Sequence, residues 1–315
     1  MRPRIVKVYA PASISNLGPG FDVLGIAIDK PGDMAIATRV PETGVHFSLR
    51  TDQEGIPADP SKNVAAHVAS LMLEEFHPAF GIKLLLEKKM PIGSGLGSSG
   101  ASSVAAAVAV NAILPKPLTK AELLRFVVEG ERKASGSPHA DNVAPSLLGG
   151  ACLIRSYDPL DVIRLPIRNT ITWVVVHPHI VVRTQEARDA LPQTIPLTSA
   201  IRQWGNVSGV TAGLMTGDAA LLGKSIEDVI IEPVRARFIP GFHDVKAAAL
   251  AAGATGCSIS GSGPSMFAVA SSAASARRIA SAMVKVFRRR GNIECDMYLS
   301  RINMDGAKIV RTTER

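Results

Sequence analysis

A segment rich in glycine and serine, residues 91–101, has the composition of an anion-binding loop. It reads PIGSGLGSSGA and continues directly into an apolar run of Ala and Val that predicts a helix over residues 102–114. Glycines let backbone N–H groups approach a phosphate closely, and a helix N-terminus adds a partial positive charge. Ser98 and Ser99 add hydroxyls suited to phosphate or Mg²⁺. A flexible linker does not normally run straight into such a helix, so the pattern favours a phosphate site.

Two known nucleotide-binding motifs are alternatives to this interpretation. Gly95, Gly97 and Gly100 satisfy GxGxxG, which in dinucleotide-binding enzymes joins a strand to a helix. That fold needs a second strand ending in an acidic residue about 20 residues later, whereas here the chain passes Pro115 into another helical pattern. Residues 217–225 have one residue too many between their glycines for a Walker A loop. The context therefore argues against an NAD-dependent oxidoreductase.

Glu131 follows the apolar stripe of the next predicted helix, where the stripe would otherwise place another hydrophobic residue. A carboxylate on such a face must be paired, neutralised or bound to a cation. The plain alternative is a half-exposed Glu that pairs with Arg132 or Lys133. The phosphate loop nearby in the sequence favours a Mg²⁺ ligand.

Two further polar segments have the composition of binding loops. Residues 135–142, SGSPHADN, bring His139, Asp141 and Asn142 together, either to bind a polar substrate or to cap the helix that follows. Their spacing does not resemble a zinc site. Residues 253–264, GATGCSISGSGP, imply close backbone approach, either to the first glycine loop or to a phosphate.

The elements that must position these residues are interspersed rather than strictly alternating. This order predicts an α+β fold, with a domain boundary near residues 159–166. The sequence predicts strands over residues 5–9, 82–86, 173–176 and 266–270, an irregular segment over 11–25, and helices over 63–76, 119–128, 244–252 and 273–290.

Composition narrows the function classes further. The net charge is +8, from 35 basic and 27 acidic residues, but the basic residues are scattered apart from residues 288–290. Aromatic residues make up only 4% of the chain, too few for a base-stacking surface, so we expect no nucleic-acid partner. Three widely spaced cysteines favour a reducing cytoplasm. The uncharged stretch over residues 90–115 is mostly Gly, Ser and Ala, which predicts no membrane anchor.

Three segments in this order resemble the signature motifs of the superfamily of galactokinase, homoserine kinase, mevalonate kinase and phosphomevalonate kinase (GHMP): residues 11–25, 91–101 and 253–264. Within it, the runs SNLGPGFDVLG at residues 15–25, SGSPHADN at 135–142 and EPVR at 232–235 are similar to homoserine kinases. The Gly-Glu-His triplet that galactokinases and mevalonate kinases carry in the first motif is absent there.

This resemblance implies a two-domain fold that binds ATP between the domains. Residues 1–162 would resemble domain 2 of ribosomal protein S5, and residues 163–315 would be ferredoxin-like. The implied activity is phosphorylation of the side-chain hydroxyl of L-homoserine in threonine biosynthesis, by a cytoplasmic homodimer. The alternatives are a related kinase for mevalonate, shikimate or an isoprenoid phosphate, and a nucleotide-binding regulator without turnover.

The resemblance also implies roles for individual residues. Mg²⁺ would be held by Glu131 and Ser99, or Ser98 in its place. ATP would bind Pro91, Ile92, Gly93, Ser94, Gly95, Leu96, Gly97, Ser98, Ser99, Gly100 and Ala101. Homoserine would be surrounded by Asn16, Asp22, His139, Asn142, Arg188 and Arg235.

Arginine suits the amino-acid substrate because its guanidinium grips a carboxylate through two parallel hydrogen bonds. Arg183 and Arg237 lie close in sequence to Arg188 and Arg235 and are alternative partners. Asp141 is the catalytic candidate for a general base, with Asp22 as a second acidic candidate. Homoserine kinases are thought to work without a dedicated base, so the base stays open.

Overall fold

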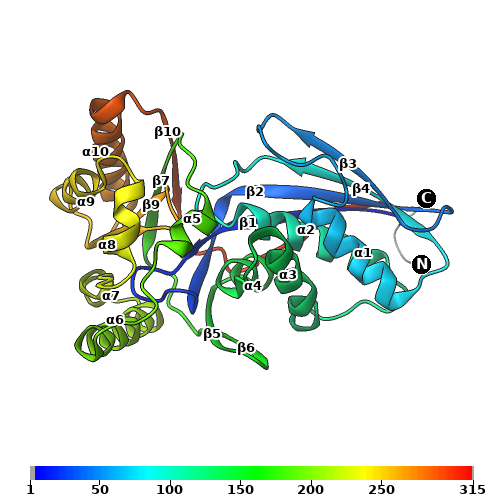
Figure 1. Ribbon diagram of the computed structural model, residues 1–315, viewed down its shortest axis with the longest axis horizontal. Coiled ribbons are helices and arrows are strands. Elements are labelled where there is room, and N and C mark those ends of the chain that lie inside the picture. Colours follow the sequence, from blue (N-terminus) through cyan, green and yellow to red (C-terminus); the bar gives the residue numbers. More distant parts are fainter. Residues whose placement is uncertain (1–3, 314–315) are drawn as a thin grey trace.

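The computed structural model describes residues 4–313, except for the side chains of residues 134 and 135. Two β-sheets form the framework of an elongated molecule (Figure 1). The larger sheet has the order β11-β1-β2-β4-β3, with β5 pairing to β2 and β6 to β5. Its strands are β1 (Ile5–Ser15), β2 (Leu24–Val40), β3 (Val45–Thr51), β4 (Gly81–Lys88), β5 (Ala151–Tyr157), β6 (Leu160–Arg164) and β11 (Lys308–Thr313). Because β11 pairs with β1, the chain returns to this first sheet after building the second.

Helices α1 (Val64–Phe76), α2 (Ser98–Ile113), α3 (Lys120–Ser135) and α4 (Ala140–Leu148) cover one face of the larger sheet (Figure 1). Helix α2 lies at the centre, against β1, β2 and the three other helices. Nearly all of its Ala and Val residues are buried. This position explains why its sequence lacks a polar face.

Local signals in the sequence set several helix boundaries. Helix α1 begins after Asn63, whose side chain accepts the N–H of Ala65 at 3.0 Å. Thr119 and Glu122 form a capping box at the start of α3. Helix α2 begins at Ser98, four residues before the predicted start, so the end of the glycine loop forms the first helical turn.

The predicted irregular segment at residues 11–25 is shorter than expected. Strand β1 continues to Ser15 because Ser13, Ile14 and Ser15 pair with the start of β2. Only residues 16–23 form the turn between these strands. Strand pairing with a partner in the same sheet thus overrides the Pro and Ser content of residues 11–15.

The smaller sheet has the antiparallel order β10-β7-β9-β8. Its strands are β7 (Thr172–Pro178), β8 (Gly256–Ile259), β9 (Met266–Ala270) and β10 (Cys295–Ser300). Between β7 and β8 lie α5 (Thr184–Asp189), α6 (Leu197–Thr216), α7 (Ala219–Ser225), α8 (Glu232–Arg235), a 3₁₀ turn η1 (Ala236–Phe238) and α9 (Phe242–Ala251), and α10 (Ala273–Gly291) joins β9 to β10. The βαββαβ order is the ferredoxin-like arrangement, which confirms the predicted α+β fold. Strand β8 lies inside residues 253–264, which the sequence presented as a glycine-rich connection.

Strand β7 is buried on both faces, which accounts for its continuous apolar run. Val174 and Val176 pack in a cluster with α9 and α10. Trp173 and Val175 point to the opposite face and join the core of the first sheet and its helices. The face of the second sheet that carries Trp173 and Val175 therefore shares a hydrophobic core with the first sheet. In residues 4–313, no helix combines the length and apolar character that a bilayer crossing would require.

Candidate active site

A cavity of about 450 Å³ is lined by most of the residues singled out in the sequence. The start of α1, the end of β4 and the glycine loop line it, together with residues at the start of α4 and in α5 and α8. Gly261 and Ser262, from the glycine-rich segment at residues 253–264, also line the cavity. Elements of both sheets thus converge on one space large enough for a small ligand.

The glycine loop presents the N-terminus of α2 to this cavity. Gly97 is the N-cap residue, with a positive φ of 66° and no side chain to cap the first turn. A Cβ at this position would lie 2.2 Å from the hydroxyl of Ser13 and 3.0 Å from Oδ1 of Asn142. Only glycine fits this backbone and this spacing. The start of α2 therefore has no capping side chain, and a helix N-terminus of this kind favours an anion.

The glycine-rich segment at residues 253–264 and Ser265, which follows it, pack against the glycine loop. The hydroxyl of Ser260 donates to the carbonyl of Gly95 at 2.6 Å. The amide and hydroxyl of Ser265 both donate to the carbonyl of Ser94, at 3.2 and 2.5 Å. A Cβ on Gly95 would lie 2.4 Å from the carbonyl oxygen of Ser260. Of the two roles left open by the sequence, close packing is therefore observed.

Arg188 joins the predicted substrate residues from three separate elements. Its Nη2 donates to both carboxylate oxygens of Asp22 at 2.9 Å and lies 2.8 Å from Nε2 of His139. Because a guanidinium can only donate, Nε2 of His139 accepts and the ring proton lies on Nδ1. Nδ1 faces Oε2 of Glu131 at 3.7 Å. Arg188 and His139 together thereby connect the carboxylates of Asp22 and Glu131.

Arg235 brings a second guanidinium to the same cavity, and this one is buried. Its Nη1 and the side-chain amide of Asn16 both donate to the carbonyl of Gly261, at 2.8 and 3.0 Å. Burial lowers the pKa of Arg235 to about 10, so it stays protonated at neutral pH. Both Arg235 and Arg188 stack over Phe21, with their Cζ atoms 5.0 and 5.2 Å from the ring centre. Within the described residues, Nε of neither guanidinium has a hydrogen-bond partner.

Asp141 and Asn142 lie in the first turn of α4, directly after His139. Burial raises the pKa of Asp141 to about 7, and the nearby charge of Asp22 adds to this shift. The side-chain carbonyl of Asn142 accepts a hydrogen bond from Ser13 at 3.1 Å, and its amide donates to Asp141 at 3.4 Å. The SGSPHADN segment thus supplies both a helix start and side chains of the cavity.

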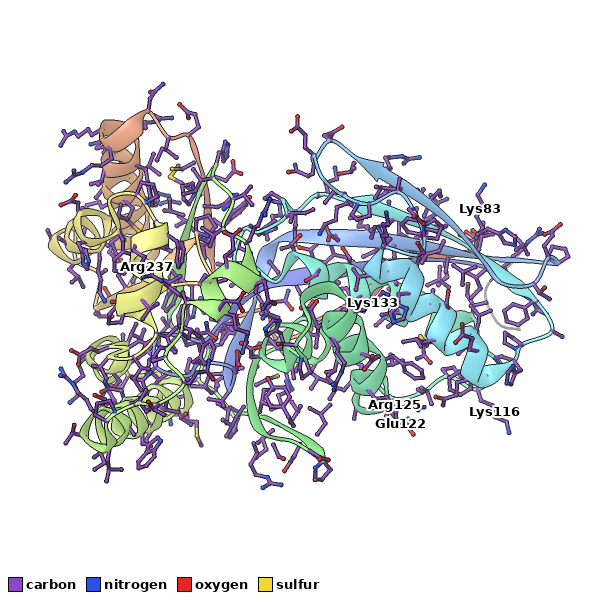
Figure 2. The ribbon with its side chains drawn as sticks, in the orientation of Figure 1. Lys83, Lys116, Glu122, Arg125, Lys133 and Arg237 are labelled. Carbon is purple, nitrogen blue, oxygen red and sulfur yellow. The ribbon has the colours of Figure 1, made fainter. Side chains whose placement is uncertain are left out.

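Glu131 is a buried carboxylate beside the first turn of α2. It is 3% exposed, and Oε1 lies 3.7 Å from the position that a Cβ on Gly100 would occupy. This burial differs from the half-exposed Glu of the alternative interpretation, whose suggested partner Arg132 bonds to Glu129 at 3.1 Å while Lys133 is exposed on α3 (Figure 2).

The donor set at this point suits Mg²⁺ delivered together with a nucleotide. Ser98 and Ser99 both line the cavity with Glu131, but the hydroxyl of Ser98 is already bonded to Lys88 at 2.6 Å. Mg²⁺ is usually held by one or two carboxylates, waters and substrate phosphates rather than by an all-protein cage. Among residues 4–313, no cluster of three or more His, Cys, Asp or Glu side chains could hold a metal by itself. The residues present therefore fit a nucleotide-bound cation.

Most of the predicted residues line the cavity, and so does Arg183, one of the alternatives. Arg183 is exposed at the cavity and bonds to Glu186, and Arg237 projects from η1 outside the cavity lining (Figure 2). The predicted residues in the lining are Asn16, Asp22, Ile92, Gly93, Ser94, Gly95, Gly97, Ser98, Ser99, Glu131, His139, Asp141, Asn142, Arg188 and Arg235. Pro91, Leu96, Gly100 and Ala101 belong to the same loop and first turn without lining the cavity.

Sequence analysis missed Phe21, Asp33 and Lys88. Phe21 lies within the SNLGPGFDVLG run, so its position beside Asp22 was a usable signal. Asp33 and Lys88 are bonded to each other although 55 residues separate them in the chain, and no local motif marks either.

Comparisons with known proteins agree with this geometry. Residues 63–150 match the GHMP kinases N terminal domain, and residues 210–289 match the GHMP kinases C terminal domain. A homoserine kinase of Chlorobium phaeobacteroides (strain BS1) is 46% identical, over 98% of this chain and 100% of that protein. A homoserine kinase of Methanococcus vannielii is 39% identical, over 84% of this chain and 87% of that protein. The crystal structure of homoserine kinase from Cytophaga hutchinsonii ATCC 33406 has a TM-score of 0.94 and 48% identity, covering 98% of both chains.

Proposed function

The chain belongs to the homoserine kinase family of the GHMP kinases, and we propose that it transfers the γ-phosphoryl group of ATP to the side-chain hydroxyl of L-homoserine. The product, O-phospho-L-homoserine, serves threonine biosynthesis. This reaction requires one site for a triphosphate and another for an α-amino acid.

One observation supports the acceptor most strongly. Arg188 and Arg235 face the same cavity as the phosphate loop, and each has a buried Nε that lacks a hydrogen-bond partner among the described residues. Two such guanidinium donors match the carboxylate of an amino acid, and the acidic side chain of Asp22 beside them matches its ammonium group. Neither mevalonate nor shikimate carries an ammonium group for Asp22.

We propose that the transfer depends mainly on positioning and on neutralising charge. The homoserine hydroxyl oxygen attacks the γ-phosphorus, the bond from that phosphorus to the β,γ-bridging oxygen breaks, and ADP leaves. The amide groups at the start of α2 would hold the phosphate oxygens. Ser99 and Glu131 would hold Mg²⁺, which neutralises phosphate charge when bound.

The hydroxyl proton must leave during the same step. Asp141 is the candidate acceptor because it is buried in the cavity and its pKa of about 7 leaves much of it ionised at neutral pH. Asn16, His139 and Asn142 would orient the substrate around it.

The direct test is ADP release by the purified protein with Mg-ATP and a panel of acceptors. L-homoserine would be compared with mevalonate, shikimate, L-serine and no acceptor. We expect turnover with L-homoserine well above every other acceptor. Turnover with another alcohol would overturn the substrate assignment while keeping the kinase. Binding of ATP without turnover on any acceptor would instead point to a nucleotide-binding regulator.

We also propose two features of the whole chain. The proposed division into residues 1–162 and 163–315 falls within β6, the last strand of the first sheet before the chain enters the second, and β11 is the strand that returns to the first sheet. A homodimer is supported by an exposed apolar face on α6, where Leu197, Ile201 and Trp204 are 67%, 56% and 60% exposed. Light scattering should give twice the chain mass of 33.2 kDa, and a mass of one chain would contradict the dimer.

A further inference from the structure

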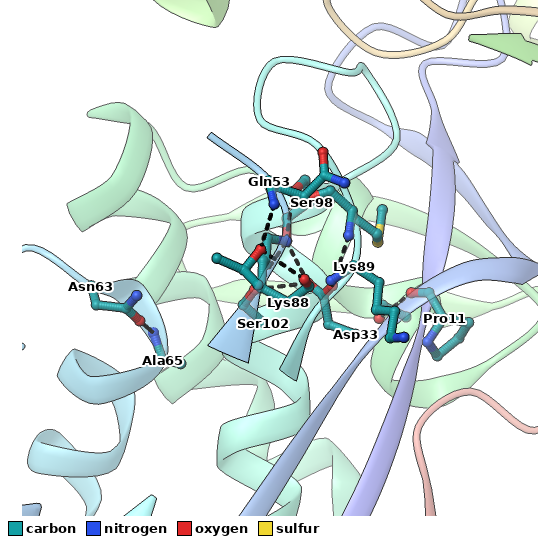
Figure 3. Close-up of polar contacts among 12 residues, drawn as sticks. Pro11, Asp33, Gln53, Asn63, Ala65, Lys88, Lys89, Ser98 and Ser102 are labelled. Carbon is teal, nitrogen blue, oxygen red and sulfur yellow. Dashed lines mark hydrogen bonds and ion pairs between the residues drawn. The ribbon is translucent and has the colours of Figure 1, made fainter. Parts of the chain in front are cut away.

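A buried ion pair lies beneath the phosphate loop, between Asp33 of β2 and Lys88 at the end of β4 (Figure 3). Asp33 is completely buried, and Lys88 is 5% exposed. Burying two charges is costly unless both are paired and their remaining hydrogen bonds are made. A buried ion pair therefore needs a structural reason, and the hydrogen bonds of Asp33 and Lys88 indicate one.

The carboxylate of Asp33 bonds to both ends of the phosphate loop. Its Oδ1 accepts the backbone N–H groups of Lys89 at 2.9 Å and Met90 at 3.1 Å, just before the loop. Its Oδ2 accepts from Lys88 and from the hydroxyl of Ser102 on α2, the latter at 2.8 Å. One side chain from β2 thus links the exit of β4 with the start of α2.

The ammonium group of Lys88 completes the same connection. It donates to Asp33, to the carbonyl of Ser98 at 2.8 Å and to the hydroxyl of Ser98 at 2.6 Å (Figure 3). These bonds use all three of its donors. Ser98 is the first residue of α2, and its hydroxyl also bonds to the carbonyl of Met90 at 3.3 Å.

Residues 91–97, which connect Met90 to Ser98, carry the bend that exposes the amides of α2. Both ends of this connection are held by the same ion pair. The loop itself is rich in glycine and has little intrinsic preference for one conformation. Without an external restraint, an ordered phosphate site would cost conformational entropy each time a nucleotide binds.

We propose that Asp33 and Lys88 are positioning residues that hold the phosphate loop in its nucleotide-binding form before ATP arrives. This rests on the proposed function only in that the loop binds a nucleotide. Lys88 acts through Ser98 rather than by contact with a reacting atom, because its donors are already occupied. Its loss should weaken nucleotide binding while leaving the homoserine subsite intact.

The test compares Lys88→Met, Asp33→Asn and the double variant Asp33→Asn/Lys88→Met by calorimetric titration with ADP and, separately, with L-homoserine. We expect Lys88→Met to weaken ADP binding about 10- to 100-fold, the loss expected for charged hydrogen bonds. Binding of L-homoserine should change less than about twofold. Lys88→Arg, which keeps the charge, should recover part of the ADP affinity.

Lys7→Met is the matched control. It removes the ion pair between Lys7 and Glu87, at 2.8 Å. Glu87 lies on β4 next to Lys88, but this pair does not involve α2. The Lys7→Met variant should bind ADP like the unchanged protein. A folded Lys88→Met that bound ADP with unchanged affinity would overturn the proposal, and so would a parallel loss for ADP and L-homoserine.

If a single variant fails to fold because one charge is stranded, the double variant decides, since it leaves no buried carboxylate without its partner. Full ADP affinity in the double variant would refute the positioning role. These readouts need no turnover, so they stand apart from the choice of acceptor. ADP binding without homoserine turnover would overturn the proposed function but not this proposal.

Discussion

Arg235 and Arg237 are two residues apart in the chain, yet only Arg235 faces the cavity. Helix α8 turns Arg235 inward over Phe21, while Arg237 is exposed on η1. The pair therefore offers a controlled comparison of the same side chain inside and outside the cavity.

Replacing Arg235 with Lys should raise the KM for L-homoserine about 10- to 100-fold. Lys keeps the charge but loses the planar fork that bonds a carboxylate and stacks on an aromatic ring. The KM for ATP should change little. Arg237→Lys is the control and should leave both constants unchanged. Steady-state kinetics with each substrate varied in turn would check this, and equal effects of the two substitutions would refute the carboxylate clamp.

Asp141→Asn tests the proton acceptor. If Asp141 takes the hydroxyl proton, the substitution should lower kcat about 100-fold or more, since Asn cannot accept it. The ionised form would then be the active one, so kcat/KM for L-homoserine, which reports the free enzyme, should rise with pH through about 7 in the unchanged protein and not in the variant. Asp189→Asn, at an exposed position on α5, is the control. Nearly full turnover by Asp141→Asn would make a general-base role untenable.

At the scale of elements, the start of α2 is the feature on which the nucleotide site depends. A glycine with positive φ is its N-cap, and the neighbouring strand and α4 approach it too closely for a Cβ. Gly97→Ala should therefore displace the loop, weaken ADP binding about tenfold or more, and lower the free energy of unfolding by roughly 1–2 kcal/mol.

Gly205→Ala supplies the contrasting control inside α6, where a Cβ would meet nothing within 4 Å. There the substitution should stabilise the protein by about 0.5–1 kcal/mol, because Ala favours a helix over Gly. Denaturant titrations with and without ADP would measure both variants. The same sign of stability change at the two positions would contradict this account of the loop.

The sequence predicted the elements better than it predicted the contacts between them. The glycine loop, the helix after it and the buried Glu131 were all readable, because each depends on local pattern. The Asp33–Lys88 pair was not, since it follows from the pairing of Met34 in β2 with Glu87 in β4, a register that no local pattern states. The choice between Arg235 and Arg237 likewise needed the geometry of α8.

At the scale of the whole molecule, a short chain of hydrogen bonds joins the second sheet to the phosphate loop. His177 at the end of β7 lies 3.1 Å from the hydroxyl of Ser265, which donates to the carbonyl of Ser94 at 2.5 Å. Because that hydroxyl donates its proton to Ser94, it accepts from the N–H at Nδ1 of His177. Hydrogen bonds from the second sheet thus help to hold the phosphate loop at Ser94.

His177 should make the stability of the protein depend on pH. Burial lowers the pKa of His177 from 6.5 to about 4. Between these values the unfolded chain binds a proton that the folded protein does not, so stability is complete above about pH 6.5 and declines as the pH falls toward 4. From pH 7 to pH 5 this group should lower the free energy of unfolding by about 2 kcal/mol.

His177→Gln removes the titrating group while keeping an N–H donor for Ser265. Urea titrations at pH 5 and pH 7 should therefore show a smaller pH-dependent loss of stability in this variant than in the unchanged protein. Substituting Gln at the exposed His179 should not reduce the loss. If His177→Gln kept the full pH dependence, another group would have to carry it. The buried histidine would then contribute only its hydrogen bond to the link between the second sheet and the phosphate loop.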